Sequence, residues 1–81
     1  MIHAYVFARL KPGTSDSAMQ NIPYISHVQS ASIVSGAYDV VVRVCVPELE
    51  QLHDVTNTIH ILAWILKTST QIIEKEFSNA S

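Results

Sequence analysis

Two segments of this chain carry the apolar patterns of β-strands that pack against a core. In Ile2–Leu10 an apolar side chain stands at every second position, the period that turns one face of a strand inward. Val40–Val46 is more apolar still, with five valines in VVVRVCV. A strand that buries one face needs another element to cover it, so the remaining segments must supply that cover.

Helices and further strands are expected around these two segments. The pair Pro12–Gly13 ends the first strand, and Pro23 ends the short helix that follows. The expected elements are a strand at 2–10, a helix at 14–22, strands at 28–35 and 40–46, a helix at 49–63 and a strand at 67–77. This order predicts an α+β, ferredoxin-like β-α-β-β-α-β fold, in which two helices lie on one face of a four-stranded antiparallel sheet.

The strand sequences agree with that topology, which places the first and third strands in the middle of the sheet. These two are the most apolar, and the serine- and threonine-rich segments suit the edges. Two helices can cover only one face of the sheet. The other face is expected to carry a mixture of aromatic, basic and apolar side chains, namely Tyr5, Phe7, Arg9, Val41, Arg43 and Cys45. Such a mixture is typical of protein interfaces, so we expect this face to pack on a second copy.

Length and charge exclude several classes of protein. With 81 residues and a formal net charge of −2, the chain is expected to form a single domain spanning 1–81, with a core of marginal size. Its basic residues are scattered, so no nucleic-acid surface is expected. The single cysteine, Cys45, excludes an internal disulfide and favours a cytoplasmic location. Neither a membrane segment nor a secretory leader is expected.

The turn between the two middle strands lies in VSGAYDVVVRV, which runs from Val34 to Val44. Gly36 and Asp39 are ordinary turn residues, and the simplest interpretation is a hairpin. The alternative is the rim of a binding pocket. In that case Gly36 exposes backbone N–H groups to a carboxylate, Asp39 accepts hydrogen bonds from an ammonium, and Tyr38 supplies an apolar wall.

Four stretches resemble the effector-binding domain of the Lrp/AsnC regulator family, also called the RAM domain: AYVFARLKPG, VSGAYDVVVRV, VPELEQL and KTSTQII. The hairpin is the most specific match, because the family has a glycine, a variable residue, an aromatic and an aspartate there. Ala63 and Trp64 depart from the proline and glycine that family members commonly have. Family regulators usually carry a helix-turn-helix domain ahead of this one, so the chain looks like a stand-alone form that does not bind DNA by itself.

The resemblance implies a site for an amino acid or a related small molecule, lined by Gly36, Ala37, Tyr38, Asp39, Thr68, Ser69 and Thr70. It also implies homo-oligomers, either dimers or octameric and decameric rings of dimers, and association with full-length regulators of the family. The expected function is therefore a non-enzymatic module for amino-acid binding and oligomerisation in the transcriptional regulation of amino-acid metabolism.

Two alternatives stay open, a purely structural oligomerisation module and a small dimeric α+β-barrel enzyme of the monooxygenase or isomerase type. The sequence has no phosphate-binding glycine loop and no nucleophile elbow. His53 and His60 stand seven positions apart, which is a poor spacing for a metal pair on a helix. We therefore expect no catalytic residue, no metal and no cofactor.

Overall fold

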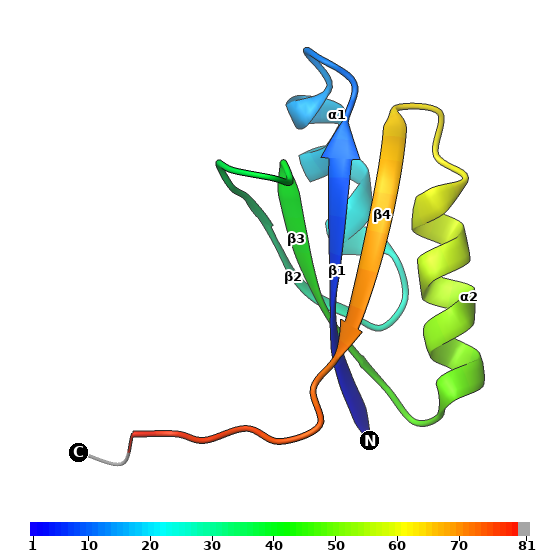
Figure 1. Cartoon of the computed structure of the whole chain (residues 1–81). Coiled ribbons are helices and arrows are strands. Elements are labelled where there is room, and N and C mark those ends of the chain that lie inside the picture. The colour runs from blue at the N-terminus through cyan, green and yellow to red at the C-terminus, as the bar shows by residue number, and fades with distance from the viewer. Residues whose placement is uncertain (80–81) are drawn as a thin grey trace.

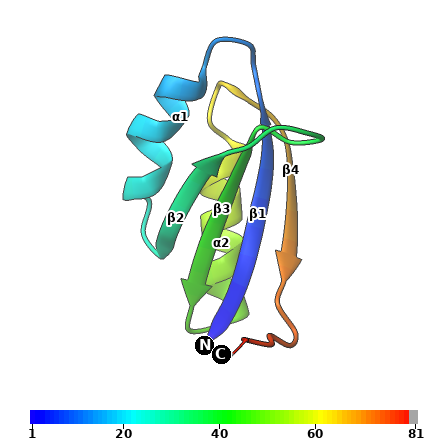
Figure 2. The same cartoon turned by 90° about the vertical axis from the view of Figure 1, so that its left-hand side faces the viewer.

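The computed structural model describes residues 1–79, and its elements follow the predicted order. They are β1 (Ile2–Leu10), α1 (Ser15–Asn21), the 3-10 turn η1 (Ile22–Tyr24), β2 (Val28–Ile33), β3 (Val40–Val46), α2 (Leu49–His60) and β4 (Ile65–Ile72). The strands form one antiparallel sheet in the order β2-β3-β1-β4, with β1 and β3 central as predicted. Both helices lie on the same side of this sheet (Figures 1 and 2). The α+β, ferredoxin-like fold is confirmed.

Alternation along β1 and β3 decides which side chains form the core. The even-numbered residues of both strands face the helices, and from Ala4 to Leu10 and from Val40 to Val46 they are buried. Ala4 and Ala8 in β1 have short side chains, which leave space above the sheet. Ala18 and Ile22 pack there as part of the same core. The core is therefore made of small aliphatic side chains, and no charged or polar residue among positions 1–79 is buried in it.

The odd-numbered residues of the central strands lie on the opposite face of the sheet, which we call the open face. In the β1–β3 register, Tyr5 stands opposite Arg43 and Phe7 opposite Val41. These side chains are half-buried among themselves. Neither described helix covers them, because α1 and α2 occupy the other side (Figure 2).

Three elements were predicted to extend too far at their C-terminal ends. The last strand ends at Ile72 instead of residue 77. Its final register pair with β1 is Ala4 with Ile72, and one more hydrogen bond follows from Ile73 N–H to the His3 carbonyl (2.9 Å). In this register β1, which begins at Ile2, has no residue opposite position 77. The second strand ends at residue 33 instead of 35, where the chain leaves the sheet to enter the turn. The long helix ends at residue 60 instead of 63.

Only one stripe of α2 is buried. Leu52, Val55 and Ile59 are buried, whereas Leu49 is 46% exposed. Ala63 lies beyond the helix, in the turn that leads to β4. The three buried positions are spaced by three and four residues, so one narrow face of α2 meets the sheet. Neither described helix is long and apolar enough to cross a membrane.

We expect Ile59→Ala to lower the free energy of unfolding by about 2–5 kcal/mol, because the Ile59 side chain is fully buried and its removal leaves a cavity under α2. Ile61→Ala is the matched control: Ile61 is 78% exposed, and we expect a change within about 0.5 kcal/mol. Urea unfolding at one fixed protein concentration measures both. Equal losses for the two variants would contradict the assigned core.

Candidate functional site

The turn between β2 and β3 bends out on the open side of the sheet (Figure 1). Its ends are held by a hydrogen bond from Val34 N–H to the Asp39 carbonyl (2.9 Å). Gly36 has a φ of +132°, a backbone conformation that is strained for any residue with a side chain. A Cβ at this position would meet no atom within 4 Å, so the glycine is needed for its conformation and not to make room for a neighbour.

Asp39 connects this turn to the centre of the sheet. Its backbone N–H donates to the Ala8 carbonyl (2.9 Å), which continues the β1–β3 ladder. Its carboxylate oxygen Oδ2 accepts a hydrogen bond from Leu10 N–H (2.9 Å) and takes the place of a backbone carbonyl at the end of the strand. Asp39 therefore stabilises the hairpin turn and the end of β1, as the hairpin interpretation expects.

The same carboxylate lines a pocket of about 230 Å³ at this end of the sheet. The pocket is bounded by the end of β1, the loop before α1, and the ends of the β2–β3 hairpin. Its lining residues are Arg9, Leu10, Lys11, Pro12, Gly13, Ser15, Ile33, Val34 and Asp39. Two cations and one anion thus share a small space with apolar side chains. This composition suits a small ligand that carries both charges.

Arg9 is fixed in part by the turn itself. Its Nη1 donates to the carbonyl of Ala37 (2.6 Å), so the guanidinium is held against the hairpin. The ammonium of Lys11 makes no hydrogen bond or ion pair with any residue from 1 to 79, although the Lys11 backbone bonds to Trp64 and Thr14. Lys11 is therefore the cation in this pocket that is free to bind an incoming anion.

The predicted residues of β4 divide between the two faces of the sheet. Ser69 stands opposite Phe7 and so belongs to the open face, whereas Thr68 stands opposite the buried Ala8 and faces the helices. Thr70, two positions on, shares the helix side with Thr68. The Thr68 hydroxyl lies 3.2 Å from Nδ1 of His60 on α2. Within one chain, the structure does not bring the two threonines into the pocket that Asp39 lines.

Tyr38, at the end of the turn, begins a row of aromatic rings along the open face. Its ring lies 5.6 Å from that of Phe7, and Phe7 lies 6.3 Å from Tyr5, measured between centroids. The guanidinium of Arg43 stands over the Tyr5 ring, 5.5 Å from its centroid. Tyr38, a predicted site residue, thus lies beside the face that we expect to pack on a second copy.

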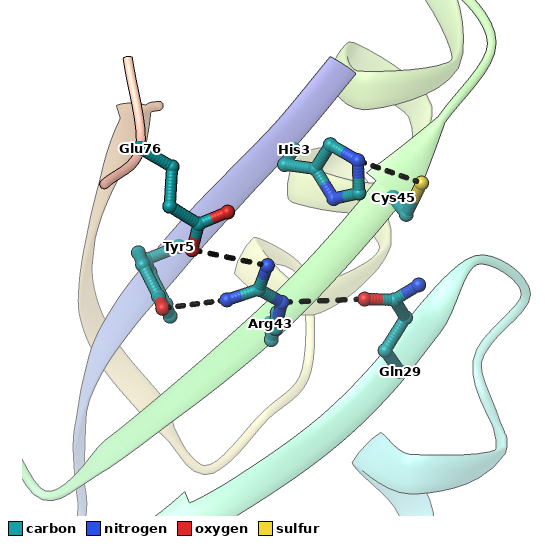
Figure 3. A network of polar contacts seen from close by, with 6 residues as sticks. All are labelled: His3, Tyr5, Gln29, Arg43, Cys45 and Glu76. Carbon is teal, nitrogen blue, oxygen red and sulfur yellow. Dashed lines mark hydrogen bonds and ion pairs between the residues drawn. The ribbon is translucent and has the colours of Figure 1, made fainter. Parts of the chain in front are cut away.

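Arg43 is the centre of a polar network in the middle of the open face (Figure 3). It donates to the Tyr5 hydroxyl (2.7 Å) and to Oε1 of Gln29 (3.3 Å), and it pairs with the Glu76 carboxylate (3.6 Å). Glu76 comes from the segment after β4, which therefore reaches the open face. These three partners hold the guanidinium on the open face.

His3 and Cys45 lie next to this network on the same face (Figure 3). Nε2 of His3 is 3.8 Å from the Cys45 sulfur, and Nδ1 of His3 is buried without a hydrogen-bond partner in the described chain. His53 is exposed on α2. No group of three or more His, Cys, Asp or Glu residues within 1–79 is arranged to hold a metal ion.

Sequence reasoning missed the two cations of the Asp39 pocket. Arg9 and Lys11 were counted among scattered basic residues, but the hairpin folds back over the end of β1 and places both beside Asp39. A signal was present in the sequence, since Lys11 directly precedes the Pro12–Gly13 turn at the same end of the sheet as the hairpin.

The model of the Lrp/AsnC ligand binding domain matches residues 3–80 of the chain. Among solved structures, TTHA0845 from Thermus thermophilus is 28% identical, with a TM-score of 0.89, over 98% of this chain and 100% of that one. AsnC from E. coli is 20% identical, with a TM-score of 0.84, over 99% of this chain and 55% of that one. Transcriptional regulator NMB0573 from Neisseria meningitidis, solved in complex with L-Met, is 12% identical, with a TM-score of 0.83, over 96% of this chain and 53% of that one. No curated protein matches in sequence.

We expect Asp39→Ala to lower the free energy of unfolding by about 1–3 kcal/mol, because it leaves the Leu10 N–H without its acceptor. Asp39→Asn is the matched control. Its side-chain carbonyl can still accept that hydrogen bond, so its loss should be clearly smaller. Urea unfolding of both variants measures the difference. If Asn and Ala cost the same, the hydrogen bond to Leu10 does not account for the role of Asp39.

Proposed function

The chain belongs to the Lrp/AsnC ligand-binding domain family, and we propose that it is a non-enzymatic module that binds an amino acid and associates with further copies of itself. Membership of this family supports a regulatory, effector-binding role. The amino-acid ligand, the self-association and the link to the regulation of amino-acid metabolism are the parts that we propose. Full-length regulators of the family are proposed as further partners, because their structures contain a domain of this fold.

The observation that carries the proposal is the charge arrangement of the Asp39 pocket. A free amino acid presents an ammonium and a carboxylate on one carbon atom. Oδ2 of Asp39 is engaged by Leu10 N–H, which leaves Oδ1 to accept from the ammonium. Lys11, which also lines the pocket, is placed to bind the carboxylate. The apolar side chains of Ile33 and Val34 line the same pocket and can contact the side chain of the ligand.

The remaining proposed site residues require assembly. Gly36, Ala37 and Tyr38 lie on the hairpin, whereas Thr68 and Thr70 face the helix side of β4. We propose that the hairpin of one chain and strand β4 of another line the complete site together. A ligand that contacts two chains stabilises the assembled state, because it binds that state in preference to separate chains.

The open face is the surface that we propose for pairing. It carries a continuous row of aromatic rings, Tyr38, Phe7 and Tyr5, with the Arg43 guanidinium over the last of them. Aromatic residues and arginine are enriched where proteins meet, because they bury a large area and keep a polar tip. A second copy that packs face to face would remove these rings from water.

An enclosed cavity containing His3 or His53 would favour the alternative of a barrel enzyme, and neither histidine gives it specific support. His53 is exposed on α2, and His3 lies beside Cys45 on the open face. Neither residue lines the Asp39 pocket. We therefore propose binding without catalysis.

Calorimetry against the common amino acids tests the ligand, with L-Met included because of the N. meningitidis complex. We expect at least one amino acid to bind the native chain and to bind Asp39→Asn at least about tenfold more weakly, because the variant loses a charge-assisted hydrogen bond to the ammonium. Asp16→Asn, which neutralises an exposed acid in α1, should bind as the native chain does. If no amino acid binds, or if the two variants bind equally well, the proposed site is wrong.

Sedimentation velocity at micromolar concentration tests the pairing surface. We expect the native chain to sediment as a dimer or a larger species. Phe7→Lys should shift it toward monomers, because a lysine in the aromatic row would bury an unpaired charge between the two sheets. The control is Tyr24→Lys, since Tyr24 is an aromatic residue of η1 that is 84% exposed; this variant should associate as the native chain does. A monomeric native chain would contradict the proposal.

A further inference from the structure

A second pocket, of about 360 Å³, lies between α2 and the loop that connects η1 to β2. Its lining residues are Ile25, Ser26, His27, Gln51, Asp54, Val55 and Thr58. None of these residues lines the Asp39 pocket. Nothing in the function proposed above uses this pocket.

The backbone at the edge of this pocket is strained. His27 has a φ of +72° and is the only residue other than glycine with a positive φ among positions 1–79. It occupies the third position of a turn closed by a hydrogen bond from Val28 N–H to the Ile25 carbonyl (3.2 Å), where glycine or asparagine is usual when φ is positive. The His27 carbonyl accepts from Cys45 N–H (3.1 Å), so β3 holds the turn in place. Strain of this kind concentrates at functional sites, and here it places an imidazole at a pocket.

Three side chains of α2, Gln51, Asp54 and Thr58, present hydrogen-bond acceptors to the pocket. Oε1 of Gln51 is buried and has no hydrogen-bond partner in the described chain. Asp54, one turn along the helix, makes no side-chain hydrogen bond or ion pair with any residue from 1 to 79. Thr58 donates its hydroxyl to the backbone carbonyl of Asp54 (2.8 Å), so its oxygen is left as an acceptor toward a ligand. A buried acceptor without a partner is costly unless a ligand or water supplies a donor.

The charge of this pocket differs from that of the Asp39 pocket. Its lining holds one carboxylate, Asp54, and neither lysine nor arginine. The Asp39 pocket holds cations as well as an anion. The second pocket is therefore suited to a ligand that is cationic and donates hydrogen bonds, and its lining has no lysine or arginine to pair with the carboxylate of a zwitterion.

We propose that this pocket binds a small organic cation with a primary ammonium group on a short aliphatic chain. The three N–H donors of an ammonium suit the Gln51 amide oxygen, the Asp54 carboxylate and the Thr58 hydroxyl oxygen. The aliphatic part contacts Ile25 and Val55, which line the apolar side of the pocket. A metal ion is the weaker fit, because His27 and Asp54 are its only lining residues of the types that usually bind metals.

The test is a titration of the native chain with n-butylammonium chloride, followed by the chemical shifts of backbone amides. We expect saturable shifts at residues 25–27 and 51–58, with affinity in the millimolar range that a ligand of this size allows. Sodium butyrate, a chain of the same length with the opposite charge, should cause no saturable shift there. Shifts that are equal for both probes, or that lie elsewhere in the chain, would overturn the proposal.

Two variants of α2 with the same change of charge isolate the contribution of Asp54. Asp54→Asn should weaken n-butylammonium binding at least about tenfold, through loss of a charge-assisted hydrogen bond. Glu50→Gln removes an exposed acid in the first turn of the same helix that does not line the pocket, and it should bind as the native chain does. Equal affinity of the two variants would overturn the proposal.

The Asp39→Asn chain separates this proposal from the function proposed above. It should bind n-butylammonium with native affinity, because Asp39 does not line the second pocket. Loss of n-butylammonium binding in this variant would mean that the cation binds at the Asp39 pocket, and would overturn the proposal.

Discussion

The structure depends on the burial of one set of side chains, the even-numbered residues of β1 and β3, under α1 and α2. Because successive residues of a strand point to opposite faces, burying this set leaves the odd-numbered set on the open face. That set includes Tyr5, Phe7 and Arg43. Both α-helices of the described chain are used as cover on the other side. The aromatic row on the open face is therefore a direct consequence of how the core is built.

Both candidate binding pockets lie near the ends of the central strands. At one end of the sheet, Asp39 caps β1 and shares a pocket with Arg9 and Lys11. The second pocket uses a turn held by β3 and one face of α2, and its only charged lining residue is Asp54. Each pocket includes a loop that is hydrogen-bonded to a central strand. Their different charges suit different ligands, a zwitterion in the first and a cation in the second.

Much of the fold could be predicted from the sequence, because the strand period and the valine content of β3 identify the central strands without knowledge of their contacts. The ends of the strands could not, since the last paired residue of β4, Ile72, is set by the register with β1. The hairpin was recognised from its glycine and aspartate. The cations beside Asp39 were not, because Lys11 and Asp39 are far apart in the sequence and only the strand topology places the end of β1 beside the hairpin. The positive φ of His27 could not be predicted, because glycine usually occupies such a turn position and the sequence gives no reason to expect a histidine there.

The central position of β1 has a consequence for the order in which this domain can form. Its Phe7 stands opposite Val41 on one side and Ser69 on the other, so its two ladders join residues far apart in the sequence. Folding slows as the average separation of contacting residues grows, because long loops must close before their contacts form. During synthesis, β1 leaves the ribosome well before β4 and must wait for it before both its edges are paired. Until then it is an apolar strand with an open edge, the kind of segment that aggregates most readily.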